Sequence, residues 1–363
     1  MGLKYKAAIY HDYNTYGAAT FDEKELPDQV GDNDVIVKNL IASICGGDME
    51  SIWHGEGGPK HMIWDGSEFG HEMVSEVIAV GKNVKGVEVG DWLFPNMGYA
   101  FHDRRRMGGI GGFSEYLVLP DFRLEGNYAI PSVDLQPSAI MLDKSLGLEN
   151  LCMFEPLNIS GRQVLQLVAA QPGGKSAVIY GCGVIGLGAA LILKHLHGYE
   201  KIVMVDFAQK RLDFAAEEYG LLTCNPSTQD LGETLIEHLG LTYGYGGKKC
   251  TADVWMDACG HNDAIDAFCK FARPGAVLGI TGIHHEASGF DAVAVCFNSL
   301  TIKGGGTAAI DITFNQAADL VRSGVDVSKF ISKKIKQEEL NEAIHELKDK
   351  NVGIKFAIDY SLK

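Results

Sequence analysis

The sequence lacks several features that would define a membrane or secreted protein. It has no uninterrupted apolar run of transmembrane length, and its first residues lack the apolar core of a signal peptide. Its eight cysteines are scattered, and no two of them form a C-x-x-C pair. Scattered cysteines are typical of free thiols in a reducing compartment. We therefore expect a cytoplasmic protein that does not associate with a membrane.

Positive charge is also scarce. The chain has 32 lysine and arginine residues against 47 aspartate and glutamate residues, and its formal net charge is −15. An acidic surface repels the phosphates of nucleic acids and of anionic lipids, so we expect no nucleic-acid partner. A chain of 363 residues, of which 46% are hydrophobic, is long enough for two domains with a sizeable core.

The clearest motif lies near the middle of the chain. The apolar run at 177–180 predicts a buried strand. Gly181, Gly183 and Gly186 follow at G-x-G-x-x-G spacing, and Val184-Ile185 lies between the last two. Such glycines permit a tight turn, a close approach to a pyrophosphate and close packing of the next helix. That helix, expected from Val184 to about residue 197, would point its N-terminal amides at the phosphates.

An acidic residue follows at the spacing that a dinucleotide site requires. Asp206 ends the next predicted strand, twenty residues after Gly186. Its carboxylate can accept hydrogen bonds from both ribose hydroxyls and would repel a 2′-phosphate, so the sequence favours NAD over NADP. Arg211 leaves two interpretations open: a solvated residue in the first turn of a helix, or a contact to the adenosine phosphate or ribose.

The rest of the chain divides into two regions with different secondary-structure signals. Residues 1–154 are rich in strand and turn signals, whereas strands and helices alternate from about residue 156. This order predicts an α/β protein in which a doubly wound parallel-sheet domain is inserted into a β-rich domain. We expect the inserted dinucleotide-binding domain over 155–299, and the β-rich domain over 1–154 and 300–363.

Three further positions could bind a metal. Cys45, His71 and Glu155 lie far apart in sequence, and none belongs to a local metal motif. Taken singly, a buried cysteine is usually an inert core residue, and a lone histidine is usually a satisfied polar side chain. Their spacing alone therefore predicts no metal site.

Taken together with the domain order, these residues resemble a known family. The matching signatures are Cys45-Gly-x-Asp48, Gly70-His71-Glu72, Gly90-Asp91, the run from Gly112 to Tyr116, Glu155-Pro156, the Gly181 motif with Asp206, and Lys303-Gly304. Over nearly its full length the chain resembles the zinc-dependent branch of the medium-chain dehydrogenase/reductase superfamily. It looks most like the sorbitol, threonine and butanediol dehydrogenases. The resemblance implies a GroES-like catalytic domain and a Rossmann domain.

The resemblance also implies a catalytic zinc site. Cys45 and His71 would bind the metal, and Glu155 would be a direct or water-bridged ligand. Glu72 would either bind the zinc or lie just outside its ligands, and Asp48 would orient the His71 ring through its N–H. Thiolate, imidazole and carboxylate suit Zn²⁺, which lowers the pKa of a bound alcohol. The hydride would pass to NAD.

The sequence departs from this family at its proton relay. The relatives usually carry Ser or Thr two residues after the zinc cysteine, where this chain has Gly47. Many polyol-type members also carry His two residues after the aspartate, where this chain has Glu50. Two interpretations of Glu50 stay open. It could take the alcohol proton, with a water filling the space at Gly47, or it could be a solvated surface acid.

A second departure concerns metal content. Many relatives bind a structural zinc through four closely spaced cysteines, but residues 96–112 of this chain contain none. We therefore expect one zinc per chain. The same stretch carries Arg104, Arg105 and Arg106. These arginines could clamp an anionic substrate, or they could form a solvated or subunit-contacting loop.

By resemblance, the backbone at Thr281, Gly282 and Ile283 and at Gly305, Gly306 and Thr307 would contact the nicotinamide. The second group could instead be a flexible glycine turn. The leading hypothesis is an NAD-linked dehydrogenase of a small polyol, sugar alcohol or hydroxy acid, assembled as a homodimer or homotetramer. The alternatives are an NADP-linked carbonyl reductase of the same fold and a non-catalytic NAD-binding relative.

Overall fold

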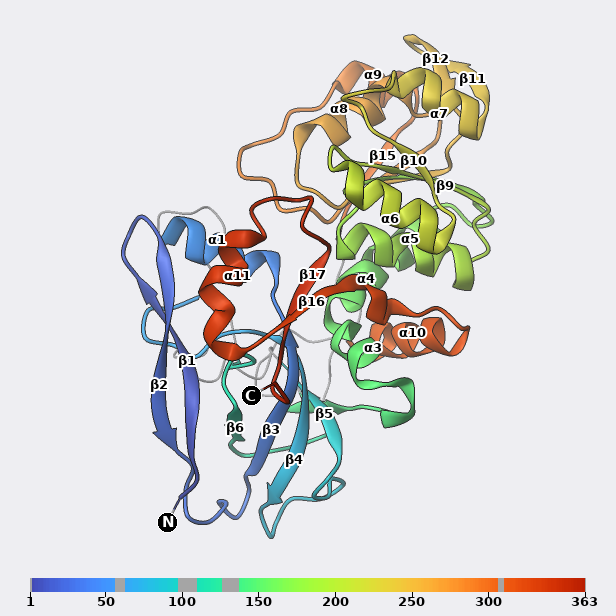
Figure 1. Ribbon diagram of the computed structural model, residues 1–363. Helices are drawn as coiled ribbons and strands as arrows, with labels where there is room; N and C mark the ends of the chain where they lie inside the picture. The colour runs from blue at the N-terminus through green and yellow to red at the C-terminus, as the bar shows by residue number, and fades with distance from the viewer. Residues whose placement is uncertain (1, 56–62, 97–109, 126–136, 306–309, 363) are drawn as a thin grey trace. The chain divides into compact units, whose positions relative to one another are not determined.

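The computed structural model describes residues 2–55, 63–96, 110–125, 137–305 and 310–362 (Figure 1). The chain forms two compact units, Met1–Glu155 with Asp326–Lys363, and Pro156–Val325. The chain returns to the first unit at Asp326, so the expected boundary at residue 300 is wrong. The chain stays in the second unit beyond residue 300 because strand β15 (Thr301–Gly304) pairs in parallel with β14 (Val277–Ile280) and completes the sheet of that unit.

The first unit is built around a mixed sheet. Its strands run in the order β16-β17-β3-β4-β5-β7, and β6 also pairs with β3. These strands are β3 (Val35–Ser43), β4 (Glu72–Val80), β5 (Trp92–Pro95), β6 (Tyr116–Leu119), β7 (Ala139–Met141), β16 (Ile331–Ile335) and β17 (Lys355–Asp359). A separate antiparallel hairpin joins β1 (Lys4–Asp12) to β2 (Gly17–Glu25). Long β-branched runs such as Val-Ile-Val in β3 fit a buried sheet.

Register in this sheet brings three distant segments together. Ser43, the last residue of β3, pairs with Glu72 of β4 on one side and with Ala357 of β17 on the other. The helices of this unit are α1 (Gly46–His54), α3 (Leu148–Cys152) and α11 (Leu340–Glu346), with 3₁₀ turns at Lys144–Leu146, Val327–Phe330 and Gln337–Glu339. Helix α1 begins immediately after β3, so its first residues lie beside the start of β4.

The second unit is a parallel sheet in the order β10-β9-β8-β13-β14-β15. Its remaining strands are β8 (Ser176–Tyr180), β9 (Lys201–Val205), β10 (Leu222–Cys224) and β13 (Val254–Asp257). The chain winds outward from β8 to β10, then crosses to β13 and winds the other way. Ligands of such sheets bind at the carboxyl ends of the strands, where the winding reverses. Here that point lies between β8 and β13.

Helices accompany the parallel strands of this unit. They are α4 (Phe154–Ala170), α5 (Val184–Leu196), α6 (Gln209–Tyr219), α7 (Leu231–Leu239), α8 (Asn262–Phe271), α9 (Ala292–Phe297) and α10 (Ile310–Arg322). Every residue of β8 and β13 is buried, as expected for central strands of a parallel sheet. Trp255 of β13 is fully buried, stacked on Tyr180 and edge-on to Phe268.

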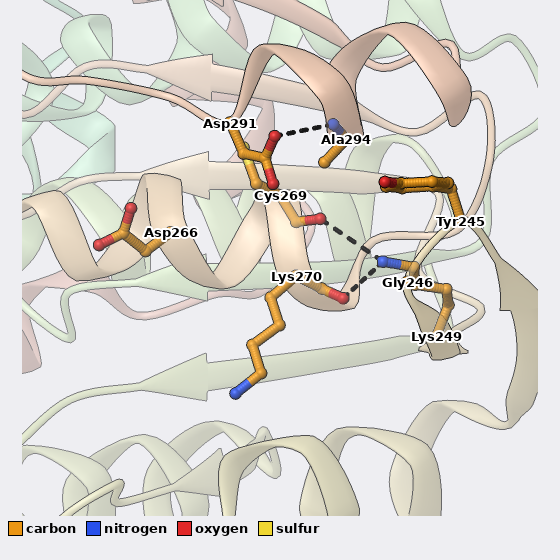
Figure 2. Close-up of a pocket in the computed structure, with 8 residues that line it drawn as sticks. All are labelled: Tyr245, Gly246, Lys249, Asp266, Cys269, Lys270, Asp291 and Ala294. Carbon is orange, nitrogen blue, oxygen red and sulfur yellow. Dashed lines mark hydrogen bonds between the residues drawn. The ribbon is translucent and has the colours of Figure 1, made fainter.

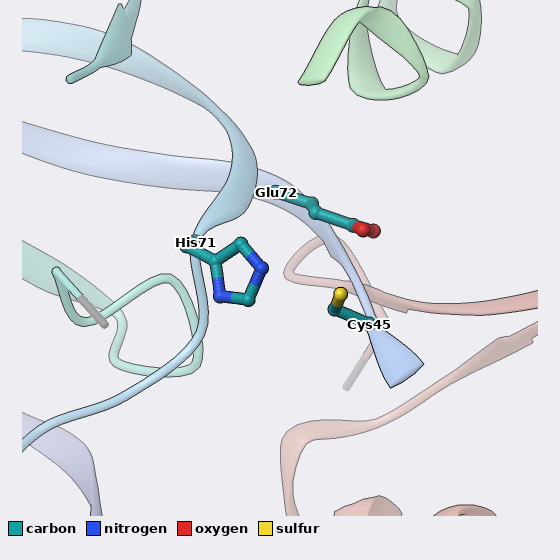
Figure 3. A group of neighbouring side chains, drawn as sticks. All are labelled: Cys45, His71 and Glu72. Atoms are coloured by element: carbon teal, nitrogen blue, oxygen red, sulfur yellow. The ribbon is translucent and has the colours of Figure 1, made fainter. Parts of the chain in front are cut away.

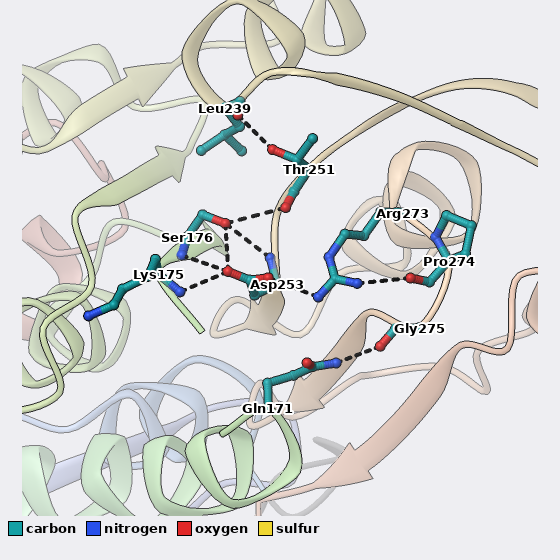
Figure 4. Close-up of polar contacts among 9 residues, drawn as sticks. All are labelled: Gln171, Lys175, Ser176, Leu239, Thr251, Asp253, Arg273, Pro274 and Gly275. Carbon is teal, nitrogen blue, oxygen red and sulfur yellow. Dashed lines mark hydrogen bonds and ion pairs between the residues drawn. The ribbon is translucent and has the colours of Figure 1, made fainter. Parts of the chain in front are cut away.

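A partly buried acid joins the amino ends of β8 and β13 (Figure 4). Asp253 Oδ2 accepts hydrogen bonds from the backbone N–H of Lys175 at 2.8 Å and of Ser176 at 3.0 Å. Its Oδ1 accepts one from the Arg273 guanidinium at 2.8 Å. Burial raises the pKa of Asp253, but these donors outweigh it and lower the pKa below the ordinary value. The sheet is therefore clamped at the end opposite to the expected ligand edge.

A short antiparallel hairpin, β11 (Leu241–Gly244) and β12 (Gly247–Cys250), lies on the same unit. Lys249 of β12 is buried and donates to the carbonyl of Lys270 at 2.6 Å, at the C-terminal end of α8 (Figure 2). A cavity of about 330 Å³ lies beside it. The lysine therefore caps a helix, because cations are favoured at helix C-termini.

The strand, helix and strand expected around the glycine motif are present as β8, α5 and β9, with ends shifted by about one residue. No element was predicted over α1, α3, α7 and α9, over strands β2, β5, β7, β10 and β16, or over the β11–β12 hairpin. Helix α1 was missed because it starts at two glycines, Gly46 and Gly47, which are poor helix formers. In the described residues, no helix is long and apolar enough to cross a membrane.

Candidate active site

Three side chains of the first unit converge in the way that a metal site requires (Figure 3). The ligand atoms of Cys45, His71 and Glu72 all lie within 4.8 Å of one another. Cys45 lies between β3 and α1, and His71 and Glu72 lie at the start of β4. The pairing of Ser43 with Glu72 sets this geometry. The structure thus brings together three of the four residues predicted to bind zinc.

A glycine turn delivers His71 to the site. Gly70 has φ +90°, and a Cβ there would lie 2.7 Å from the Phe113 ring. Its carbonyl accepts hydrogen bonds from the backbone N–H of Ile110, Gly111 and Gly112 at 2.9–3.2 Å. Only glycine fits this turn without strain. The Gly70-His71-Glu72 and Gly112-Phe113 signatures are therefore parts of one packed loop pair.

The buried polar atoms fit a metal at this place. His71 Nδ1 and Asp48 Oδ1 lie 3.6 Å apart, and neither has a hydrogen-bond partner among the described residues. Asp48 is fully buried, and its other oxygen accepts the Cys45 backbone N–H at 3.0 Å. An Nδ1–H that faces Asp48 leaves His71 Nε2 for a metal. Because thiolate, imidazole and carboxylate are zinc ligands, the residues present fit the ion of the family.

The pKa values describe a site that holds protons until a cation displaces them. Burial raises the pKa of the Cys45 thiol, and Glu72 raises it further. Burial alone would lower the pKa of His71, but Asp48 and Cys45 outweigh it and hold this pKa well above its ordinary value. Burial also raises the pKa of Asp48 to about 6. Metal binding would release protons from Cys45 and His71.

A buried lysine neutralises Glu72. The Lys355 ammonium donates to Glu72 Oε2 and, at 2.8 Å, to the Ile44 carbonyl. The Ser43 hydroxyl donates to the same Glu72 oxygen. Burial opposes ionisation of Glu72, but Lys355 and His71 lower its pKa below the usual value. Glu72 is therefore an anion fixed beside Cys45 and His71.

The sequence did not identify Lys355. It is the first residue of β17, in a stretch where a single lysine suggests an exposed face. Strict alternation along a strand would place only one of Lys355 and Phe356 on a buried face. Both are buried, so alternation alone could not have identified the lysine.

Glu155 and Glu50 lie outside the three-residue group. Glu155, in the first turn of α4, is 8% exposed and is among the groups that raise the pKa of His71. The Glu50 side chain is 15% exposed, and its Oε2 lies 3.8 Å from Nε2 of His54, one turn later in α1. A Cβ at Gly47 would meet no atom within 4 Å. The position of the usual relay hydroxyl is thus open space.

The second unit brings the glycine motif and Asp206 together at the carboxyl edge of its sheet. Gly181 has φ +96°, and a Cβ at Gly186 would lie 1.9 Å from the Gly181 carbonyl oxygen, so both positions require glycine. Asp206 follows β9, and its two oxygens accept the backbone N–H of Cys182 at 2.7 Å and of Ala208 at 2.8 Å. The acid is therefore fixed directly beside the glycine turn.

Arg211 and the segment after β14 complete this edge. The Arg211 guanidinium lies 3.7 Å from the position of a Cβ on Gly183, which places it at the glycine turn. The backbone N–H groups of Thr281 and Gly282 donate to the Asp257 carbonyl, each at 2.9 Å. Gly305 follows β15. Gly306, Thr307 and Arg104–Arg106 lie outside the described residues.

Two family models match the chain: the alcohol dehydrogenase GroES-like domain over residues 31–125, and the zinc-binding dehydrogenase domain over residues 184–323. The L-threonine 3-dehydrogenase of Vibrio vulnificus strain YJ016 is 27% identical over 334 residues, which cover 86% of this chain and 88% of that protein.

Two solved structures have the same fold. The 2R,3R-butanediol dehydrogenase of Bacillus subtilis has a TM-score of 0.75 at 23% identity, covering 98% of this chain and 99% of that one. An alcohol dehydrogenase of Escherichia coli CFT073, complexed with NADH, has a TM-score of 0.75 at 20% identity, covering 99% and 100%.

The chain therefore belongs to the zinc-dependent medium-chain dehydrogenase/reductase superfamily. It is an oxidoreductase of the alcohol dehydrogenase class, which acts on CH–OH groups. The predicted family and the predicted fold class, a GroES-like domain with a Rossmann domain, are confirmed. The model that matches residues 184–323 is that of a zinc-binding dehydrogenase, and the NADH is a ligand of the Escherichia coli structure.

The Lys355–Glu72 pair generates a stability prediction. In zinc-free protein, Lys355→Met should lower the free energy of unfolding at pH 7 by about 3–5 kcal/mol, because it leaves Glu72 as an uncompensated buried charge. Adding Glu72→Gln should recover much of the loss. Urea denaturation followed by circular dichroism measures both. The control is Lys333→Met, whose ion pair with Glu346 is exposed and is worth at most about 1 kcal/mol.

The pair also gives a pH dependence. Because the folded-state pKa of Glu72 is lowered, its stabilising contribution is present above the ordinary pKa of glutamate and is lost as pH falls through the lowered value. The difference in stability between wild type and Lys355→Met should therefore shrink on acidification. A variant as stable as wild type at pH 7 would contradict this account.

Proposed function

We propose that this protein oxidises the secondary alcohol of a small polyol, sugar alcohol or hydroxy acid, with NAD as the hydride acceptor and one catalytic zinc per chain. The convergence of Cys45, His71 and Glu72 within 4.8 Å carries the proposal. A protein that only binds a dinucleotide has no need of this buried donor set. The absence of cysteine from residues 96–112 supports a single zinc.

Each residue of the site has a proposed part. Cys45 and His71 hold the metal, and Glu155 is a third ligand, directly or through water. Glu72, kept ionised by Lys355, either binds the metal or balances its charge. Asp48 accepts the Nδ1–H of His71 and so fixes the tautomer and the ring orientation. When bound, zinc supplies a Lewis acid that lowers the pKa of an alcohol hydroxyl.

The second unit provides the proposed NAD site. The backbone at Gly181, Gly183, Val184 and Ile185 would contact the pyrophosphate, and Gly186 allows α5 to lie close. Asp206 would accept hydrogen bonds from the adenosine ribose. It would repel a 2′-phosphate, which disfavours the alternative of an NADP-linked carbonyl reductase.

Three further parts of the chain complete the proposed NAD site. The place of Arg211 beside Gly183 supports a contact to the ribose or phosphate over a purely solvated role. The segment Thr281–Ile283 and the turn at Gly305, with Gly306 and Thr307, would receive the nicotinamide end.

The leading proposal is tested by NADH production in zinc-quantified protein. The substrate panel comprises polyols, sugar acids, phosphorylated polyols, 2,3-butanediol and threonine, with NADP in parallel. We expect turnover with NAD and about one zinc per chain. Cys45→Ser should lose the zinc and lower kcat/KM by at least about 100-fold, because removing a ligand costs metal affinity. Cys296→Ser, at an exposed free cysteine, is the matched control.

The other outcomes of this experiment separate the alternatives. Bound NAD without zinc or turnover would support the non-catalytic relative. Preference for NADP would overturn the part assigned to Asp206. Activity confined to anionic substrates would favour the anion clamp at Arg104–Arg106 over a solvated loop.

We further propose that Glu50 accepts the alcohol proton and passes it to His54. The low exposure of Glu50 and its 3.8 Å separation from the half-exposed His54 support a path from the interior to solvent. The open space beside Gly47 can hold the connecting water. The arrangement replaces the hydroxyl and histidine that the family resemblance leads one to expect.

Glu50→Gln should lower kcat by about 10- to 100-fold near neutral pH, because amides are poor bases. The loss should decrease at high pH, where hydroxide can accept the proton instead. His54→Gln should act in the same direction with a smaller effect. Steady-state pH–rate profiles measure both. Glu50→Gln with no loss of rate at any pH would leave Glu50 as a structural acid.

We propose that the protein assembles as a homodimer or homotetramer through the second unit. β15 is an edge strand of the parallel sheet, and Phe290, Val293 and Phe297 before it are each about half exposed or more. An unpaired edge flanked by apolar side chains favours pairing across a two-fold axis. Light scattering should give the mass of two or four chains, and a concentration-independent monomer would refute this assembly.

A further inference from the structure

A chain of hydrogen bonds lies at the carboxyl ends of β13 and β14. Asp257, the last residue of β13, is fully buried. Its Oδ1 accepts the backbone N–H of Cys259 at 3.0 Å and of Gly260 at 2.9 Å. Its Oδ2 lies 2.7 Å from Nε2 of His284, in the loop after β14. The carboxylate is therefore held by one turn of backbone and one histidine.

The other nitrogen of His284 reaches the start of α8. Its Nδ1 lies 2.8 Å from the Ser288 hydroxyl oxygen and 3.2 Å from Oδ1 of Asn262. The Ser288 hydroxyl also lies 2.5 Å from that same Asn262 oxygen. The His284 side chain is only 14% exposed. The network thus joins three segments: the end of β13, the first residue of α8 and the loop over 281–291.

The backbones of two of these segments are in direct contact. The Asp257 carbonyl accepts the N–H groups of Thr281 and Gly282, each at 2.9 Å. A Cβ at Gly282 would lie 2.0 Å from the Gly260 nitrogen, and a Cβ at Gly260 would lie 2.4 Å from the Ile283 carbonyl oxygen. No side chain separates the two turns. Any shift of His284 relative to Asp257 would therefore move the backbone of 281–283.

Serine, histidine and aspartate also form the triad of many hydrolases, but here their surroundings differ. A hydrolytic triad needs backbone N–H donors for the oxyanion. The amides of Cys259 and Gly260 are used by Asp257, and the Ser288 hydroxyl is engaged by Asn262 as well as by His284. A satisfied network in a buried place rigidifies the segments that it joins. The hydrogen bonds of this network fix the loop over 281–291.

We propose that His284, acting through Asp257 and Ser288, is a positioning residue that presets the backbone of 281–283 for the nicotinamide end of NAD. This inference rests on the proposed NAD site and adds to it the hydrogen-bond network that orders the segment at the nicotinamide end. A preset segment contributes to affinity because its ordering does not have to occur on binding. The adenosine end is fixed separately, by the Gly181 turn and Asp206 on the other side of β8.

The two ends of the cofactor can be tested separately in the full-length protein. NADH and ADP-ribose share the adenosine, the pyrophosphate and the second ribose, and only NADH carries the nicotinamide. His284→Ala should weaken NADH binding roughly five- to tenfold, because a charge-assisted hydrogen bond is lost from the loop. ADP-ribose should bind within about twofold of wild type. Isothermal titration calorimetry measures both dissociation constants without a substrate.

Two further variants define the role. His284→Gln keeps an N–H donor at the reach of Nε2 and should recover most of the NADH affinity. His285→Ala removes the adjacent exposed histidine of the same loop and should leave both affinities unchanged. ADP-ribose binding to His284→Ala also shows that the second unit is folded.

The outcomes distinguish this inference from the proposed function. Wild-type protein that binds neither ligand would overturn the NAD site, and the positioning role with it. Wild-type protein that binds both, with unchanged NADH affinity in His284→Ala, would overturn the positioning role alone. An equal loss of NADH and ADP-ribose would also overturn it, because the effect would then be general.

Discussion

The buried pair of Lys355 and Glu72 is the interaction on which the zinc-binding unit depends. It links β17, from the C-terminal segment, to β4 across the end of β3, where Ser43 and the Ile44 carbonyl complete the contacts. Burying two charges costs several kcal/mol per ion, which their attraction recovers only with good geometry. The chain must therefore return from the second unit to place Lys355, and the discontinuous order of the first unit is a condition of its site.

The two ends of the parallel sheet in the second unit have different structural roles. At the amino end, Asp253 ties β8 and β13 with hydrogen bonds from backbone, hydroxyl and guanidinium groups. At the carboxyl end, glycines replace side chains, so that Gly181, Gly260 and Gly282 can lie against neighbouring backbone. An edge without side chains lets a ligand approach the backbone closely, and it stays in place because the far end is clamped.

The sequence predicted the parts of this protein whose physical signal is local. The glycine spacing predicted the turn that lies beside Asp206, and the resemblance pointed to Cys45, His71 and Glu72, which lie together in the structure. Lys355, Asp257 and His284 were missed because their significance depends on partners between 27 and 283 positions away in sequence. A lysine in a strand looks exposed until the strand is placed in the middle of a sheet. The expected start of the second unit differs from the observed start by one residue, but the expected end lies 26 residues too early. The sequence of β15 does not show which of the two sheets the strand joins.

Asp206, Asp257 and Glu72 lie at strand ends in the two proposed binding regions, and each is stabilised differently. Asp206 relies on two backbone amides, and Asp257 on amides and a histidine, but Glu72 faces a full positive charge. The difference follows from its neighbours. Cys45, Glu72 and Glu155 would together place more negative charge around the proposed zinc than the ion can balance. Lys355 supplies one further positive charge there, which offsets part of this excess, to which the buried Asp48 also contributes. Lysine at position 355 is thus a requirement of the ligand set as well as of the fold.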